Sequence, residues 1–214
     1  MVRRPRVLVA DDHQIVTGGL RVLLEPKFDL VGIVENGRDL LEAAARLRPD
    51  VIVADISMPL LNGIEAIRQL KKAGEPAPVV LLTMHLEATY AARAFDAGAS
   101  GYVLKHAAPS ELITAIEEAL KGRTYITPMI AKDLVQAYRD GAPKQLDPAR
   151  RLTPRQLEVL QLLAEGHSAK EMASILKISP RTVEFHKYKM MEKLDIRTTA
   201  ELVQYAMKHG LVSE

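Results

Sequence analysis

The chain has 214 residues, of which 48% are hydrophobic and 26% charged, and its formal net charge is +2. This composition is typical of globular proteins and excludes disorder, collagen and a coiled-coil rod, and the length allows two small domains. The absence of cysteine excludes disulfides, thiol catalysis and cysteine-ligated zinc, and the six histidines show no familiar metal-ligand spacing. The apolar runs are far too short to span a membrane and no signal-peptide cleavage site is evident, so we expect a cytoplasmic protein that does not bind membranes.

The first part of the chain alternates short apolar runs with amphipathic segments. Continuous apolar runs rich in β-branched residues predict strands that are buried on both faces. The predicted strands are Arg6–Ala10, Leu30–Val34, Val51–Ala54, Val79–Leu82 and Tyr102–Leu104. The predicted helices are His13–Leu24, Gly37–Leu47, Asn62–Lys72, Glu87–Ala97 and Pro109–Lys121. The repeated strand–helix order predicts an α/β doubly wound fold with a five-stranded parallel sheet over residues 1–124.

Residues 125–150 have a different pattern. Thr127 and Pro128 can start a helix, in which Ile130, Leu134 and Tyr138 share one face. The helical periodicity ends after this segment, where the chain contains Gly141, Pro143 and Pro148. We therefore predict a linker helix followed by a tether.

Residues 151–214 contain four helix-start signals and no strand pattern. Three of the starts are capping boxes, and the fourth is Ser179 with a proline at the first helical position. The starts are Thr153, Ser168, Ser179 and Thr198. A short turn at Lys177–Ile178 joins the second and third helices, as in a helix-turn-helix, whose second helix lies in the major groove of DNA. The segment is thus predicted to be a small all-α domain.

Polar residues follow the predicted strands at the edge where a parallel sheet binds its ligands. Asp11 and Asp12 follow the first strand, and Asp55 follows the third. The fourth strand is followed by Thr83, and the fifth by Lys105. Three carboxylates in one crevice need a cation, and oxygen ligands favour Mg²⁺. This cation with Lys105 would balance a phosphoryl group on Asp55. The chain lacks the glycine-rich loop that holds ATP, which favours a phosphoryl receiver over a kinase.

These residues resemble the receiver domain of bacterial two-component response regulators, which has a flavodoxin-like fold. The resemblance covers roughly residues 5–122 and rests on Asp11-Asp12, Asp55-Ile56-Ser57-Met58-Pro59, Thr83 and Gly101-Tyr102-Val103-Leu104-Lys105. It implies that Asp55 is the phosphoacceptor and that Mg²⁺ is held by Asp11, Asp12 and Asp55. It also implies that Thr83 and Lys105 sense the phosphoryl group, with Tyr102 as the switch aromatic. Tyr102 is alternatively a simple aromatic residue on an edge strand.

Residues 151–207 resemble a LuxR-type DNA-binding domain. The resemblance rests on Leu152-Thr153-Pro154-Arg155-Gln156, Glu158-Val159-Leu160, Ala164-Glu165-Gly166, Lys170-Glu171, Ser179-Pro180-Arg181-Thr182-Val183, His186 and Lys193-Leu194. Together with the N-terminal receiver, this order of domains resembles the NarL/FixJ subfamily of transcriptional response regulators.

The third helix of this region is predicted to contact DNA. Its Val183, His186, Met190 and Leu194 recur at helical spacing and are expected to face the core. The resemblance implies that the DNA surface comprises Arg181, Thr182, Glu184, Phe185, Lys187, Tyr188 and Lys189. Glu184, Phe185 and Tyr188 stand at the positions of base contacts, and the basic residues lie toward phosphates. Family members often have lysine where Glu184 stands, and a glutamate repels phosphates.

We therefore expect a DNA-binding transcriptional regulator that a partner histidine kinase switches by phosphorylating Asp55, and that binds promoter DNA as a homodimer when phosphorylated. Leu202, Val203 and Ala206 of the last helix either form a dimer contact or pack in their own domain. One alternative function is a phosphohydrolase, but Ser57 stands where such enzymes usually carry a second acid. Another is a DNA-binding regulator whose receiver is a ligand-controlled or dimerising scaffold that does not depend on phosphorylation.

Overall fold

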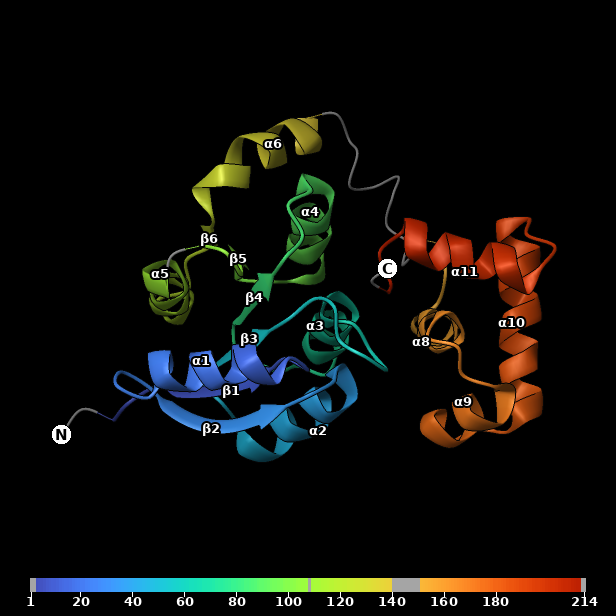
Figure 1. Cartoon of the computed structure of the whole chain (residues 1–214), viewed down its shortest axis with the longest axis horizontal. Helices are drawn as coiled ribbons and strands as arrows, with labels where there is room; N and C mark the ends of the chain where they lie inside the picture. The colour runs from blue at the N-terminus through green and yellow to red at the C-terminus, as the bar shows by residue number, and fades with distance from the viewer. Residues whose placement is uncertain (1–2, 108, 140–150, 213–214) are drawn as a thin grey trace. The chain divides into compact units, whose positions relative to one another are not determined.

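The computed structural model describes residues 3–107, 109–139 and 151–212. The described residues before 140 form one compact unit, and those after 150 form a second (Figure 1). None of the described helices is both long and apolar enough to cross a bilayer.

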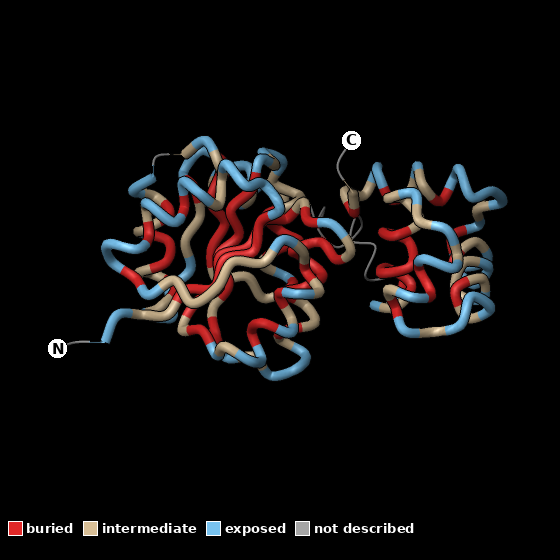
Figure 2. Tube along the Cα trace, turned by 60° about the horizontal axis from the view of Figure 1, so that its bottom comes forward, coloured by how far each residue is buried: buried red, intermediate tan, exposed pale blue. Residues whose placement is uncertain are grey.

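The first unit is built on a six-stranded parallel sheet with the order β2-β1-β3-β4-β5-β6. The strands are β1 (Arg6–Ala10), β2 (Asp29–Val34), β3 (Val51–Ala54), β4 (Val79–Thr83), β5 (Gly101–Leu104) and β6 (Tyr125–Ile126). The five predicted strands are confirmed, and the sheet has a sixth, the short β6, which was not predicted. Strands β1, β3, β4 and β5 are almost entirely buried, in red at the centre of this unit in Figure 2.

Helices cover both faces of the sheet, as the doubly wound prediction requires. They are α1 (Gln14–Leu24), α2 (Gly37–Leu47), α3 (Gly63–Lys72), α4 (Ala88–Ala97) and α5 (Pro109–Leu120). Successive strand residues point to opposite faces, so Val7 and Val9 pack with α1 and α5, whereas Leu8 packs with α2 and α3. Each face of the sheet therefore has its own apolar core, and both cores include residues of the central strands.

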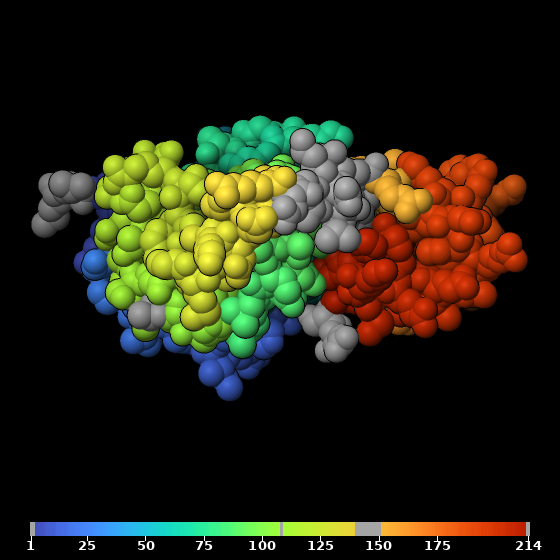
Figure 3. Space-filling model, turned by 90° about the horizontal axis from the view of Figure 1, so that it is seen from above, coloured from blue at the N-terminus to red at the C-terminus, as the bar shows by residue number. Residues whose placement is uncertain are grey.

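Helix α6 (Pro128–Arg139) starts at the predicted position and packs against α4, where Figures 1 and 3 show the two side by side. Ile130 is 2% exposed, and Leu134 packs on the core. The Tyr138 hydroxyl lies 3.4 Å from the carbonyl oxygen of Ala92 and 3.3 Å from Asp96 Oδ1 on α4. The predicted linker helix is thus part of the first compact unit. The predicted tether, from Gly141 to Pro148, lies outside the described residues.

Strand β6 fastens the start of α6 to the sheet. Tyr125 and Ile126 pair with β5, and Thr127 then donates its backbone N–H to the carbonyl of Tyr102 over 3.0 Å. The Thr127 hydroxyl accepts from the backbone N–H of Leu104 over 3.2 Å. Two residues are too few to form an apolar run, which is why the sequence pattern did not reveal this strand.

The second unit consists of four described helices, α8 (Pro154–Ala164), α9 (Ala169–Leu176), α10 (Pro180–Leu194) and α11 (Thr199–Lys208). The predicted capping boxes at Thr153, Ser168 and Thr198 are confirmed, as is the cap at Ser179. Lys177 adopts a left-handed conformation with φ 54° and closes α9 just before α10. Helices α9 and α10 therefore form the predicted helix-turn-helix.

The apolar side chains of the second unit meet in one core. Leu160, Val183 and Met190 are fully buried. Leu202 and Ala206 of α11 are also fully buried, so these two side chains pack in the core and are not available to a second molecule. Val203 is half-buried and Met207 is 42% exposed, so part of the last helix remains on the surface.

Candidate functional site

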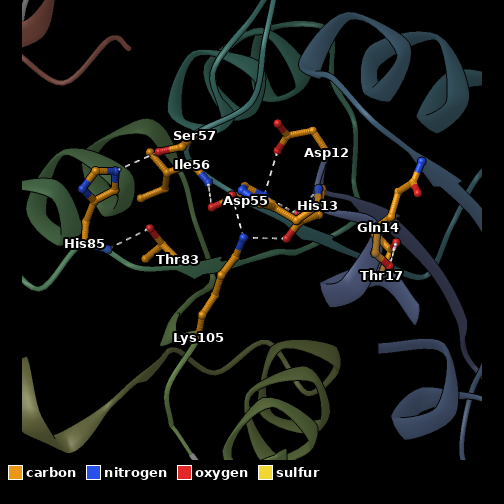
Figure 4. Close-up of polar contacts among 11 residues, drawn as sticks. Asp12, His13, Gln14, Thr17, Asp55, Ile56, Ser57, Thr83, His85 and Lys105 are labelled. Carbon is orange, nitrogen blue, oxygen red and sulfur yellow. Dashed lines mark hydrogen bonds and ion pairs between the residues drawn. The ribbon is translucent and has the colours of Figure 1, made fainter. Parts of the chain in front are cut away.

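The ends of β1 and β3 bring the predicted carboxylates together (Figure 4). The backbone N–H of Asp55 donates to the carbonyl of Ala10 over 2.8 Å, which aligns the two strand ends. Asp11 and Asp55 are 2% and 3% exposed, whereas Asp12 is exposed. Ligand atoms of Asp11, Asp12, Asp55 and His13 all lie within 4.8 Å of one another. The cluster therefore has a buried floor and an open side.

Lys105, which follows β5, extends into this cluster (Figure 4). Its Nζ lies 2.8 Å from Asp11 Oδ2 and 2.8 Å from Asp55 Oδ2. Burial raises the pKa of the Asp55 carboxyl, and the hydrogen bond from Lys105 only partly opposes this rise. Burial would by itself lower the pKa of Lys105, but hydrogen bonds to both carboxylates and their charges raise it overall. The ammonium is therefore held in its charged form between two acids.

The backbone around Asp55 is fixed by a close contact with the first residue of α3. The backbone N–H of Ile56 donates to Asp55 Oδ1 over 2.7 Å, and that of Gly63 donates to the Ile56 carbonyl over 2.9 Å. A Cβ atom at Gly63 would lie 2.1 Å from the Asp55 carbonyl oxygen, a distance that no real side chain could occupy. Only glycine fits here, so α3 can approach the loop that carries Asp55 closely.

Thr83 and Tyr102 meet at His85 in the loop after β4. The backbone N–H of His85 donates to Thr83 Oγ1 over 3.2 Å, and the Tyr102 hydroxyl donates to the His85 carbonyl over 3.0 Å. Tyr102 is fully buried on an interior strand, so its interpretation as an edge-strand aromatic was wrong. Burial also raises the pKa of Tyr102, which keeps its hydroxyl protonated.

Two histidines in this region were missed by the sequence prediction. His13 Nδ1 lies 3.0 Å from Asp11 Oδ1 and 3.1 Å from Asp12 Oδ1. His85 Nε2 lies 3.0 Å from Ser57 Oγ, and its ring stacks on Tyr90 of α4 with centroids 4.0 Å apart. Burial lowers the pKa of His85, so its ring is neutral near pH 7. His13 could have been predicted from the sequence, because it directly follows Asp11 and Asp12.

Helix α10 presents the predicted DNA-contact residues on the surface of the second unit. Phe185 is 57% exposed and Tyr188 64% exposed, and Arg181 and Lys189 are exposed as well. The Thr182 hydroxyl lies 2.8 Å from Ser179 Oγ at the start of the helix, where it takes part in the cap. The predicted core face is confirmed for Val183, Met190 and Leu194, which are buried, while His186 is half-buried.

Glu184 and Lys187 form an ion pair on the flank of this exposed surface. Lys187 Nζ lies 2.6 Å from Glu184 Oε2 and 5.4 Å from the centroid of the Tyr188 ring. The Lys187 side chain is only 18% exposed, and its ammonium lies beside both neighbours. The structure thus brings an acid, a base and an aromatic ring together on one turn of the helix.

Comparison with known proteins divides the chain in the same way. The response regulator receiver domain matches residues 7–117, and the luxR family of bacterial regulatory proteins matches residues 150–206. The response regulator GacA of Pseudomonas aeruginosa is 36% identical over 210 residues, which cover 97% of each chain. The response regulator UvrY of Escherichia coli is 33% identical over 96% of this chain and 94% of its own.

Solved structures of similar sequence have the same fold. RcsB of Salmonella enterica serovar Typhimurium, bound to a promoter in the presence of the phosphomimetic BeF₃⁻, matches with a TM-score of 0.60 and 30% identity. The match covers 95% of this chain and 98% of that one. A LuxR-family response regulator from Aurantimonas sp. matches 63% of this chain with 36% identity and a TM-score of 0.60. This chain therefore belongs to the NarL/FixJ family of DNA-binding two-component response regulators, which are transcription factors and not enzymes.

Proposed function

We propose that Asp55 accepts a phosphoryl group from a phosphohistidine of a partner histidine kinase, and that this modification switches promoter binding by the C-terminal unit. The observation that carries the proposal is the buried Asp55 carboxylate, which Lys105 joins to Asp11 next to the exposed Asp12. A buried nucleophile with a fixed cation on one side and an open side on the other suits an incoming phosphoryl group. Because a kinase phosphodonor and promoter DNA are both cytoplasmic, we assign the protein to the bacterial cytoplasm.

The transfer replaces the P–N bond of the phosphohistidine with a P–O bond to Asp55. One carboxylate oxygen of Asp55 attacks phosphorus, the P–O bond forms, the P–N bond breaks, and its electron pair returns to the imidazole of the kinase. The backbone N–H of Ile56 holds the other end of the carboxylate, and Lys105 balances the negative charge of the phosphoryl oxygens. Asp55 must be ionised to attack, so its raised pKa favours the reaction at neutral pH over acidic pH.

The donor set of the cluster fits Mg²⁺. Carboxylate oxygens of Asp11, Asp12 and Asp55 would hold the ion, since magnesium prefers oxygen ligands at an open site that keeps several waters. When bound, the ion would supply positive charge next to the phosphoryl oxygens. The nitrogen of His13 suits magnesium less well, and in this structure it lies against the carboxylates of Asp11 and Asp12.

The modified site would be sensed by Thr83 and Tyr102, which both contact the backbone of His85 in the loop after β4. Thr83 can donate its hydroxyl to a phosphoryl oxygen, and its contact with the His85 backbone would then change. Tyr102 holds the same loop through the His85 carbonyl, so it would respond to that change. Phosphorylation would thus bias an equilibrium between two arrangements of the loop after β4.

On the second unit, α10 would lie in the major groove of promoter DNA. Glu184, Phe185 and Tyr188 would face the bases, while Arg181, Lys187 and Lys189 would lie toward phosphates and Thr182 at the helix start. Paired helix-turn-helix units read two half-sites, so the phosphorylated form would bind as a homodimer. The proposed domain limits are 1–124 for the receiver, 125–150 for the linker, whose β6 and α6 pack on the receiver, and 151–214 for the DNA-binding domain.

Intact mass spectrometry after incubation with acetyl phosphate and Mg²⁺ tests the phosphoryl transfer. We expect one phosphoryl adduct on the native chain, and none with EDTA or with Asp55→Asn. Asp29→Asn is the matched control, because it removes an exposed carboxylate on β2 and should leave the adduct unchanged. An adduct that persists in Asp55→Asn, or no adduct at any time on the native chain, would favour a receiver that acts as a phosphorylation-independent scaffold.

A further inference from the structure

The solvent face of α10 carries an unusual pair of aromatic side chains. Arg181, Phe185, Tyr188 and Glu192 follow one another at helical spacing and are all exposed, whereas Val183 and Met190 on the other face are buried. Among the described residues of the second unit, Phe185, Tyr188 and Met207 are the large apolar side chains that are more than about two-fifths exposed. Two of these three are neighbours at the middle of the helix that the proposed function places in the major groove.

The polar residues beside this pair are engaged with each other. Glu184 and Lys187 form the ion pair of 2.6 Å, and Lys187 also lies over the Tyr188 ring. The charge of Glu184 is thereby largely balanced, and the Lys187 ammonium already has a partner on its own helix. The side chains that remain more than half exposed between the flanking charges and have no ion pair of their own are the rings of Phe185 and Tyr188.

The flanking charges indicate which partner covers these rings. Arg181 is exposed one turn before Phe185, and Lys189 is exposed next to Tyr188. Lys189 pairs with Glu192 over 2.7 Å, but both side chains are more than half exposed, and such pairs give way easily to a phosphate. This arrangement is complementary to the major groove of DNA. The cations match the phosphates at the edges of the groove, and the apolar centre matches the methyl groups of thymines on its floor.

We propose that Phe185 and Tyr188 read the 5-methyl groups of thymines, so that apolar contact, and not hydrogen bonding to guanine, specifies the central bases of each half-site. This inference rests on the proposed placement of α10 in the major groove. Phe185 has no polar atom in its side chain and can distinguish bases only through such contacts or through shape. Lys187 is a positioning residue, which neutralises Glu184 and supports the Tyr188 ring.

Binding-site selection followed by removal of single methyl groups tests the proposal. The full chain, treated with acetyl phosphate and Mg²⁺, selects sites from a pool of random DNA duplexes, and each thymine of the selected site is then replaced by deoxyuridine. This change leaves base pairing intact and removes only the methyl group. We expect at least one replacement in each half-site to weaken binding about threefold to fivefold, as expected for loss of one buried methyl contact.

Variants assign the effect to the aromatic pair. In Phe185→Ala or Tyr188→Ala, the penalty for one deoxyuridine position should disappear, whereas Phe185→Leu should keep it because leucine also packs against a methyl group. Arg181→Ala is the matched control, since it should weaken binding to all duplexes equally and leave the ratio of thymine to deoxyuridine affinities unchanged. All these side chains are largely exposed, so the fold should tolerate their replacement.

The outcomes separate this inference from the proposed function. Sequence-specific binding in which every deoxyuridine duplex binds within twofold of its thymine parent would overturn the methyl readout and leave DNA binding by α10 intact. A penalty that persists in both alanine variants would also overturn it. Failure of the phosphorylated chain to select any sequence would instead contradict the proposed function.

Discussion

In the receiver unit, the side chains proposed to act are buried, with 0% to 3% exposure for Thr83, Asp11 and Asp55. Lys105 joins the two carboxylates, and Thr83 accepts from the backbone N–H of His85. On α10 of the second unit, Phe185 and Tyr188 are more than half exposed. The first site is embedded at the carboxyl edge of a sheet with apolar cores on both faces, whereas the second lies on the outside of a single helix.

This difference determines how each site responds to change. A buried charged site depends on every neighbour, because a missing partner leaves a charge without water and without a counter-ion. An exposed surface keeps its fold when a side chain is removed, and its contributions to binding are closer to additive. Substitutions should therefore have large effects on folding in the receiver and graded effects on binding in α10.

The largest effect is expected from Gly63→Ala. The new Cβ would overlap the carbonyl oxygen of Asp55 and force the loop to shift, which should cost about 2 to 3 kcal/mol in free energy of unfolding. Phosphorylation by acetyl phosphate should slow as well, because Asp55 moves. Urea unfolding measures the first effect. Gly18→Ala is the control, since nothing lies within 4 Å of its Cβ on α1, and it should stabilise the chain by about 0.5 to 1 kcal/mol.

Lys105→Met should have the next largest effect. It leaves the buried carboxylates of Asp11 and Asp55 without their shared cation, which should cost about 2 kcal/mol at pH 7. The loss should shrink as the pH falls, because the raised pKa of Asp55 favours protonation of its carboxyl, and it should also shrink on addition of Mg²⁺. Lys27→Met removes a lysine from an exposed ion pair with Glu117 and should change stability by less than about 0.5 kcal/mol. If Lys105→Met and Lys27→Met lost equal stability, the buried ion pairs would contribute no more than the exposed one, and this prediction would be wrong.

Asp55→Asn should change stability in the opposite direction. Because burial raises the pKa of Asp55, the folded chain favours the protonated carboxyl, and ionisation at neutral pH destabilises it. The neutral asparagine should therefore stabilise the chain at pH 7 by an amount on the order of 1 kcal/mol. The difference should disappear as the pH falls through the raised pKa toward the ordinary value of 3.8. Thermal unfolding of both chains in EDTA between pH 4 and 8 measures this difference in stability. A difference that stays constant across that range would contradict its origin in the ionisation of Asp55.

Thr198→Ala tests whether damage in the second unit stays local. Thr198 Oγ1 accepts from the Glu201 N–H over 3.2 Å, and Glu201 Oε2 accepts from the Thr198 N–H over 3.0 Å. Loss of this capping box should cost about 1 kcal/mol and increase hydrogen exchange in α11. Amides of the receiver sheet should be unchanged. Thr114→Ala, which removes an exposed hydroxyl bonded only within α5, should leave both units unaffected.

The smallest effects are expected from Arg181→Ala and Lys189→Ala. Each should weaken DNA binding about threefold for all sequences and lower the slope of log affinity against log salt concentration by about 1. Fluorescence anisotropy at several salt concentrations measures both quantities. Lys208→Ala on α11 is the matched control, because it removes an exposed lysine outside the proposed DNA surface. An unchanged slope in Arg181→Ala would exclude a phosphate contact for that residue.

The sequence predicted those features that leave a local pattern. Continuous apolar runs predicted β1 to β5, and caps such as Ser168 with Glu171 predicted the starts of the C-terminal helices. Strand ends of a parallel sheet converge, so Asp11, Asp55 and Lys105 were also expected to meet. The roles of these residues were suggested by resemblance to a family, which local pattern alone does not supply.

Features that depend on the path of loops were not predicted. His85 reaches Ser57 because the loops after β3 and β4 leave neighbouring parallel strands at the same edge of the sheet, and the path of these loops leaves no periodic signal in the sequence. Glu184 and Lys187 stand at a spacing that allows an ion pair, but two flexible side chains can also point elsewhere. Their contact, and the orientation of Lys187 toward Tyr188, became visible only in the folded helix.

The short β6 also has a consequence for the solubility of the receiver. Without it, β5 would be an apolar edge strand with open backbone groups, and such edges pair readily with other chains and lead to aggregation. Tyr125 and Ile126 cover the first half of that edge, and the Thr127 hydroxyl takes up the N–H of Leu104 beyond it. The segment that leads into α6 therefore protects the sheet against self-association, and Thr127→Val should leave the buried N–H of Leu104 without its acceptor.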